Sequence, residues 1–158
     1  MENQNKQRPE DVYRLLCDTL DKRKIRYEKS GGDLLVKFEM AGKSMPIRIL
    51  MMVDKERSLI KLLSPLPFAV PENKRLDMSL AVNALNNQLP EGNFDYEYAS
   101  GRLCFRIASC FKECEIAAAV PEYLLFLAGV VVDRFNDKLR MFSEGAVSLE
   151  QLLNGKDK

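Results

Sequence analysis

The sequence predicts an α+β protein in which one antiparallel sheet packs against helices. Two observations carry this prediction. Apolar residues recur at three- and four-residue spacing in three long stretches, as on amphipathic helices, and they alternate with polar residues in the stretches between, as on half-buried strands. The resulting order is α-β-β-β-α-β-β-α, with short polar turns between the strands. Short turns join antiparallel neighbours, so we expect a meander of about three strands followed by a hairpin.

Composition indicates one ordinary globular domain. The chain has 158 residues, of which 46% are hydrophobic and 30% are charged, and a domain of about 150 residues buries roughly 70% of its unfolded surface. Its net charge of +1 provides no field that would concentrate nucleic acid or an anionic membrane. The most apolar run, residues 124–132, is shorter than the roughly 20 residues of a membrane span. We therefore expect neither nucleic-acid nor membrane partners.

Histidine is absent from the chain. Its absence removes the commonest general base and the commonest metal ligand, and it prevents a Ser-His or Cys-His nucleophile system. We therefore expect no enzyme, no metal site and no cofactor. Residues 1–8 form a polar lead that we expect to be disordered; it has no apolar segment typical of a secretory signal, which favours a cytoplasmic protein.

The first half of the chain predicts a helix and three strands. Proline and two acidic residues, Pro9, Glu10 and Asp11, are favoured in the first turn of a helix. A short extended stretch and the turn at Gly31 and Gly32 follow. Alternation then predicts strands over residues 34–40, 46–53 and 59–64. We expect Pro65 and Pro67 to end the third strand, because proline cannot donate to a sheet ladder.

The second helix is expected from Val70 to Leu89. Asn83 and Asn86 lie near the edge of its apolar stripe, and asparagine is a poor residue for a helix interior. We therefore expect a tertiary hydrogen bond at each, and they are our candidate polar groups for a pocket between sheet and helices. Gly92 is expected to close this helix in a left-handed conformation.

A hairpin follows, with its turn at Ser100 and Gly101. Phe94, Tyr96 and Tyr98 alternate before the turn, and large apolar residues alternate after it, which is period-two patterning on both arms. Such a row of aromatic side chains could stack on bases. Packing beneath a helix is the favoured interpretation.

The last long helix is expected from Pro121 to about Phe142 and carries two apolar stripes. The main stripe is wide enough to cover a sheet. A second stripe, Tyr123, Phe126 and Val130, extends roughly to Met141 on another face. Surplus apolar surface on a helix indicates either deeper burial or a partner contact, and the sequence favours neither. Residues 146–158 are expected to form a short terminal helix and a tail.

The four cysteines do not form a recognisable site. Cys17 and Cys104 lie on apolar patterns and are expected in the core. Cys110 and Cys114 lack the tight Cys-x-x-Cys spacing of zinc and redox motifs. They are nevertheless the best nucleophiles for an enzyme, and burial of both would remove that hypothesis.

An ordered set of residues resembles the YbjN-like domain of bacteria. The set comprises the run Val70-Pro71-Glu72-Asn73-Lys74-Arg75, then Asn83-x-x-Asn86, Gly92-x-Phe94, Gly101-x-Leu103-x-Phe105-Arg106 and Gly145. The resemblance covers residues 9–145 as a single domain. That domain is similar in structure to the type III secretion chaperones, which bind partly unfolded effector segments without catalysis. The resemblance implies a bacterial, cytoplasmic and often homodimeric α+β protein with sensory or regulatory roles and no known catalytic residues.

Three hypotheses for function follow. The leading one is a non-enzymatic protein-binding module, chaperone-like or regulatory, that works as a homodimer and contacts a partner through Tyr123, Phe126 and Val130. It would recognise a protein segment by strand addition or by apolar anchors in a groove. The alternative is a small-molecule-sensing regulatory domain with its ligand near Asn83 and Asn86. The third is an enzyme that uses carboxylates or a cysteine.

Overall fold

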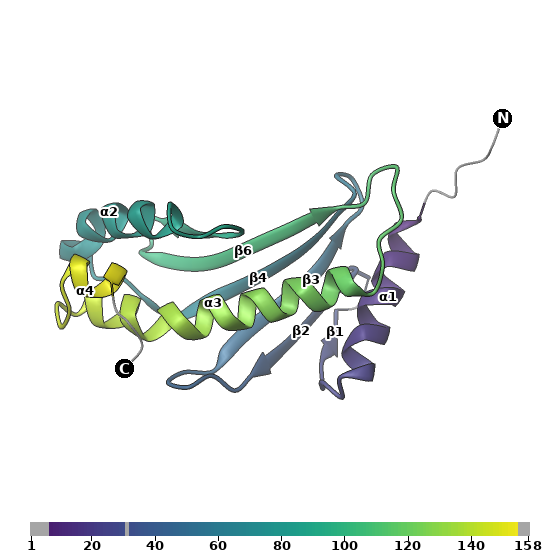
Figure 1. Cartoon of the computed structure of the whole chain (residues 1–158), viewed down its shortest axis with the longest axis horizontal. Helices are drawn as coiled ribbons and strands as arrows, with labels where there is room; N and C mark the ends of the chain where they lie inside the picture. The colour runs from purple at the N-terminus through teal and green to yellow at the C-terminus, as the bar shows by residue number, and fades with distance from the viewer. Residues whose placement is uncertain (1–6, 31, 155–158) are drawn as a thin grey trace.

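A six-stranded antiparallel sheet forms the centre of the computed structural model, which describes residues 7–30 and 32–154 (Figure 1). The order of strands across the sheet is β1-β2-β3-β4-β6-β5. The strands are β1 (Glu28–Lys29), β2 (Leu35–Met40), β3 (Ile47–Asp54), β4 (Leu59–Ala69), β5 (Asn93–Glu97) and β6 (Arg102–Cys110). Most of the expected lead and the end of the tail fall outside the described residues.

Alternation along the strands separates the two faces of the sheet. Met51 is buried and pairs with Val36 on one side and Leu62 on the other, so one row of apolar side chains crosses the three strands of the meander. Their neighbours Leu50 and Met52 point to the other face and are half-buried. The buried row defines the face that receives the helices.

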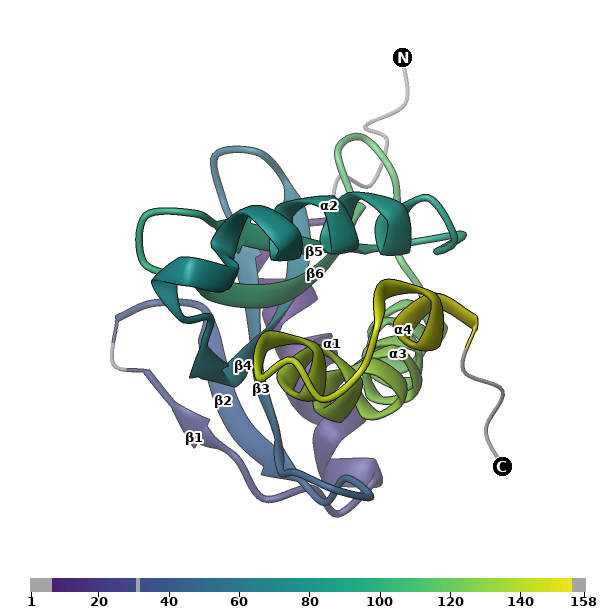
Figure 2. The same cartoon turned by 90° about the vertical axis from the view of Figure 1, so that its left-hand side faces the viewer.

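Two helices cover this inner face. Helix α1 (Pro9–Lys22) contacts β3, and helix α3 (Ala119–Ser143) contacts β3, β4 and β6. Figure 2 shows both helices on the same side of the sheet. In the described part of the chain no helix lies over the opposite face, which carries half-buried Leu50 and Leu63 beside exposed Arg48. The outer face of the meander is therefore left to solvent.

The remaining helices close one end of the sheet. The 3₁₀ turn η1 (Glu72–Lys74) leads into α2 (Arg75–Asn86), which packs along β5 (Figure 2). Helix α4 (Leu149–Asn154) contacts α2 and α3. It buries Leu152, so this helix packs on the core through one side chain.

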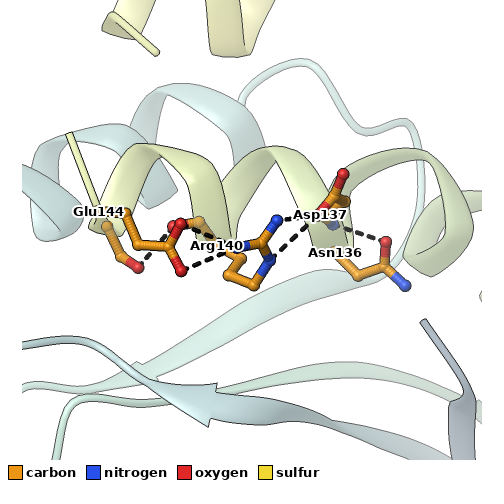
Figure 3. A network of polar contacts seen from close by, with 5 residues as sticks. Asn136, Asp137, Arg140 and Glu144 are labelled. Carbon is orange, nitrogen blue, oxygen red and sulfur yellow. Dashed lines mark hydrogen bonds and ion pairs between the residues drawn. The ribbon is translucent and has the colours of Figure 1, made fainter. Parts of the chain in front are cut away.

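The C-terminal end of α3 is held by a polar network (Figure 3). The guanidinium of Arg140 donates to Asp137 at 2.7 Å and to Glu144 at 2.8 Å, and the backbone N–H of Asp137 donates to the Asn136 side chain at 2.6 Å. The two partners of Arg140 lie three and four residues from it, where side chains on a helix meet. Helix α3 ends at Ser143, close to the expected Phe142, and Gly145 follows it with a φ of +76°.

The strand count differs from the prediction by one. The expected meander and hairpin are present, but β1 adds a sixth strand of two residues that pairs Glu28 with Lys37 and Lys29 with Val36. Both of its residues are exposed. Two exposed residues carry no alternation, so periodicity could not find this strand.

The prediction that Pro65 and Pro67 end the third strand is wrong, because β4 continues to Ala69. Pairing of β4 with β3 stops at Leu63, so beyond it the strand pairs with β6 alone. A register shift between Pro65 and Ala69 accommodates the second proline. Proline is tolerated where the ladder has one side free.

The predicted end of the second helix is also wrong. Helix α2 ends at Asn86, and Gly92 lies six positions later, in the connection to β5 rather than at the helix terminus. Its φ is +71°, and a Cβ there would lie 2.5 Å from Cζ of Phe105. Gly92 is thus required where the chain passes over the Phe105 ring, which is a different reason from capping.

Candidate protein-binding surfaces

The second apolar stripe of the last helix lies on the surface. Tyr123 is 47% exposed, Phe126 66% and Val130 50%. The opposite side of the same helix is buried in the core through residues such as Leu124 and Ala128. We call the three exposed side chains the α3 ridge. The structure thus excludes deeper burial within the chain for these three side chains, and the partner contact stays a prediction.

A groove runs along the ridge on the α1 side. It has a volume of about 310 Å³, and apolar side chains form most of its lining: Ile25, Met40, Leu125, Phe126 and Val130. Gly129 belongs to its wall, where a Cβ would lie 3.3 Å from Cε of Met40. Arg23 and Glu122 form an ion pair of 3.6 Å at this groove. An apolar floor beside a charged pair is typical of a surface that binds protein side chains.

A larger cleft lies on the other side of the ridge. Its volume is about 680 Å³, and it is bounded by the first turns of α3, the approach to β5 and the end of β6. The Tyr123 hydroxyl donates to Oε2 of Glu91 at 2.6 Å across the cleft, and this hydrogen bond raises the pKa of Tyr123. Arg106 pairs with Asp95 at 2.6 Å on the lining, so its charge is already balanced.

Asn86 and Asn83 do not form a common site. The side chain of Asn86 accepts from the Phe94 N–H at 2.8 Å and donates to the Phe94 carbonyl at 3.0 Å, as we expected of a tertiary contact. Asn83 is exposed, and its side chain has no hydrogen-bond partner among the described residues. The prediction of a tertiary bond is therefore wrong for Asn83, because the helix turns this position to solvent. The structure provides no support for a small-molecule pocket here.

Sequence analysis missed a second exposed apolar surface on α2. Leu76 is 66% exposed and Leu80 is 61% exposed. Their spacing of four residues places them on one side of the helix, and this spacing was the available signal.

The aromatic row of the hairpin is only partly in the core: Phe94 is buried against Phe105 and Phe135, whereas Tyr98 is exposed. Strand β5 ends at Glu97, so Tyr98 no longer follows the strand alternation.

The cysteines divide into two pairs. Cys17 is buried, as expected, whereas Cys104 is only half-buried and does not belong to the core; its partial burial raises the pKa of its thiol. Cys110 and Cys114 are exposed, so burial does not remove them as nucleophiles. The Cys114 thiol lies 3.6 Å from the carbonyl oxygen of Cys110. Within residues 7–30 and 32–154 no cluster of cysteine and carboxylate side chains has an arrangement that would hold a metal ion.

Among the described helices, none combines the length and the apolar character needed to cross a membrane. This includes α3, whose 25 residues are long enough but carry charged side chains on the exposed side.

Comparison with known proteins supports the fold. No protein-family model matches the sequence, and no curated protein matches it. A chain in the crystal structure of the ExsC–ExsE complex is similar over 80% of this chain and 91% of that chain, with a TM-score of 0.51 and 10% sequence identity. The structure of the HopA1–SchA chaperone–effector complex matches over 84% and 93%, with 14% identity and a TM-score of 0.49, too low to support an argument. At such identities the similarity concerns the fold alone.

Proposed function

We propose that this protein is a non-enzymatic, chaperone-like binding module that works as a homodimer and binds a segment of another protein. The observation that supports it most is the α3 ridge with a hollow on each side. Three large apolar side chains are exposed side by side on one helix, and an exposed apolar patch of this kind marks a surface that binds another protein. Its fold is similar to a chain that was crystallised in a complex with a second protein.

The ridge is the surface that we assign to the homodimer. Phe126 and Val130 stand beside an apolar groove on the same helix, so a second copy related by a two-fold axis can place its ridge in this groove. The groove and ridge together make the surface self-complementary. The remaining features of the proposal, a YbjN-like domain over residues 9–145 of a bacterial and cytoplasmic protein, rest on the ordered residues of the resemblance.

Light scattering tests the dimer. We expect twice the monomer mass for the wild-type protein and the monomer mass for Phe126→Asp with Val130→Asp. Both side chains are exposed, so the circular dichroism spectrum should not change. Leu76→Asp with Leu80→Asp is the matched control, because these side chains have similar exposure on another helix. A monomeric wild type, or a monomer from the control alone, would contradict the assignment.

Affinity capture tests partner binding. The immobilised wild-type protein should recover a specific protein from native lysate of the source cells. Recovery should decrease when the immobilised protein is denatured before the lysate is added. Capture of no specific protein would count against the binding function.

A further inference from the structure

The edge of the sheet beyond β5 is open over the last residues of β6. Strand β5 pairs with β6 from Arg102 to Arg106 only. Strand β6 continues to Cys110 and pairs there with β4, where Leu59 is the partner of Cys110. Within the described part of the chain, residues 107–110 therefore have a neighbouring strand on one side and none on the other.

The backbone groups at this edge have a defined direction. Phe94 bonds Asn86 through its N–H and C=O, so these groups point away from β6. Its partner Phe105 then turns its own backbone groups toward β4, and the direction alternates along an antiparallel strand. By this alternation the N–H and C=O groups of Ala108 and Cys110 point to the open side. The N–H of Phe111 agrees with this, since it donates to Ser58 on the β4 side at 2.9 Å.

Gly92 and Glu91 keep the edge free. The left-handed Gly92 carries the chain over the Phe105 ring, and the Glu91 side chain then reaches Tyr123 on α3. Residue 91 would otherwise continue β5 opposite Ala108. The N–H and C=O of Ala108 find no hydrogen-bond partner on this side among the residues that the structure describes.

The open edge is one wall of the 680 Å³ cleft. Ala108 and Ser109 line the cleft from the strand, and Val120 and Tyr123 line it from the first turns of α3. A cleft of this volume is in the range that encloses a ligand. Because α3 stands over the strand, the space suits a single extended chain better than the edge of another folded sheet.

From this geometry we infer that an extended segment of a partner protein adds to the sheet as a strand along residues 107–110 of β6. The inference rests on the proposed protein-binding function and names its site. Ala108 supplies one backbone donor and one acceptor to the added strand, which is the source of affinity in strand addition. Residues of the segment opposite Ile107 and Ser109 face α3, and the residue between them faces solvent. The segment is therefore apolar, polar, apolar in sequence.

A tethered peptide tests the site. In the full-length Cys110→Ser variant, Cys114 is the single exposed thiol, and it lies at the end of the open edge. A disulfide to acetyl-Cys-Gly-Val-Thr-Val-Thr-amide brings the peptide to an effective concentration on the order of millimolar. We expect hydrogen exchange of the Ala108 amide, followed by NMR, to slow by at least about tenfold. Unchanged exchange at Ala108 would overturn the inference.

Two controls separate strand addition from simple crowding. The peptide acetyl-Cys-Gly-Val-Pro-Val-Thr-amide has proline at the position opposite Ala108, so it lacks the N–H that would donate to the Ala108 carbonyl and should not protect Ala108; equal protection by both peptides would also overturn the inference. In Cys110→Ser with Ala108→Pro, the valine peptide should no longer protect the amide at position 110. Protein capture without protection of Ala108 would leave the proposed function standing and remove this site. Protection of Ala108 without capture of any protein would support the site and count against the function.

Discussion

The backbone N–H and C=O groups of Phe94 and Ala108 point toward the same edge of the sheet. Those of Phe94 are hydrogen-bonded, whereas those of Ala108 have no partner among the described residues. At Phe94 the amide of Asn86 donates and accepts once each, at 3.0 Å and 2.8 Å, and takes the place of a neighbouring strand. At Ala108 the corresponding groups face a cleft. The Asn86 side chain thus satisfies the backbone groups at one part of the edge. At the other part they stay unpaired, because Gly92 turns the chain away before it can pair with Ala108.

The two parts of the edge also differ in how they are covered. An unpaired strand edge invites association with other chains, and proteins cover such edges with helices, loops or side chains. Helix α2 covers the edge at β5, whereas α3 only overhangs the edge at β6. The open part is short and recessed, which restricts it to a single extended segment.

Proline substitution at adjacent positions gives the largest expected difference. Ser109→Pro removes a donor to β4 inside the ladder and should lower the free energy of unfolding by about 2–4 kcal/mol. Ala108→Pro removes a donor that faces the cleft, so we expect a change within about 1 kcal/mol. Urea denaturation measures both. Equal losses for the two variants would show that the N–H of Ala108 is already hydrogen-bonded in the folded protein.

Substitution of Gly92 should have the next largest effect. Gly92→Ala combines a left-handed backbone with a Cβ placed 2.5 Å from the Phe105 ring, and we expect a loss of about 2–3 kcal/mol. Gly32→Ala is the control: its φ is +90°, but no atom lies within 4 Å of the added Cβ. It should therefore cost only about 1 kcal/mol, the cost of the backbone conformation. Thermal unfolding that ranks Gly32→Ala as the more damaging change would contradict the role given to Gly92.

Removal of the Asn86 amide tests the closed part of the edge. Asn86→Ala leaves two backbone groups of Phe94 without their partner, and we expect a loss of about 2 kcal/mol. Asn83→Ala, on the exposed side of the same helix, should change stability by less than about 0.5 kcal/mol. The Phe94 amide should also exchange faster in Asn86→Ala. If the two variants were equally stable, the side chain of Asn86 would not be what closes the edge.

Thiol labelling should distinguish the exposed cysteines at the end of β6 from the buried and half-buried cysteines without changing stability. Iodoacetamide is expected to modify Cys110 and Cys114 readily in the folded protein. Cys17 should react only on unfolding because it is buried, and Cys104 should react slowly, since burial raises the pKa of its thiol. Mass spectrometry of the folded protein checks this. Early modification of Cys17 would mean that the core near α1 opens more easily than the structure implies.

The sequence predicted the α+β architecture and the candidate ridge because both depend on periodicity. The spacing of Tyr123, Phe126 and Val130 placed them on one side of a helix, and the structure places that side at the surface. Periodicity could not reveal strand β1, whose two residues are both exposed, or the passage of β4 through Pro65. Both depend on which neighbours a strand finds in the sheet.

The unpaired edge at residues 107–110 could not be predicted from the sequence either. The pattern of alternation continues along β6 to Cys110, but nothing in it says where the neighbouring strand begins. That boundary depends on the conformation of Gly92, which the sequence suggested was a helix cap. The partner of Asn86 was also hidden, since an asparagine at the end of a helix has many possible acceptors and donors.

Residue-specific hydrogen exchange in the free wild-type protein tests the central contrast most directly. The Phe94 amide bonds Asn86 and is buried with its side chain, whereas the Ala108 amide faces the cleft. We predict that Ala108 exchanges at least about a hundredfold faster than Phe94, since a free amide needs no opening of the structure. Protection of Ala108 equal to that of Phe94 would mean that the edge is already paired, and it would contradict the account.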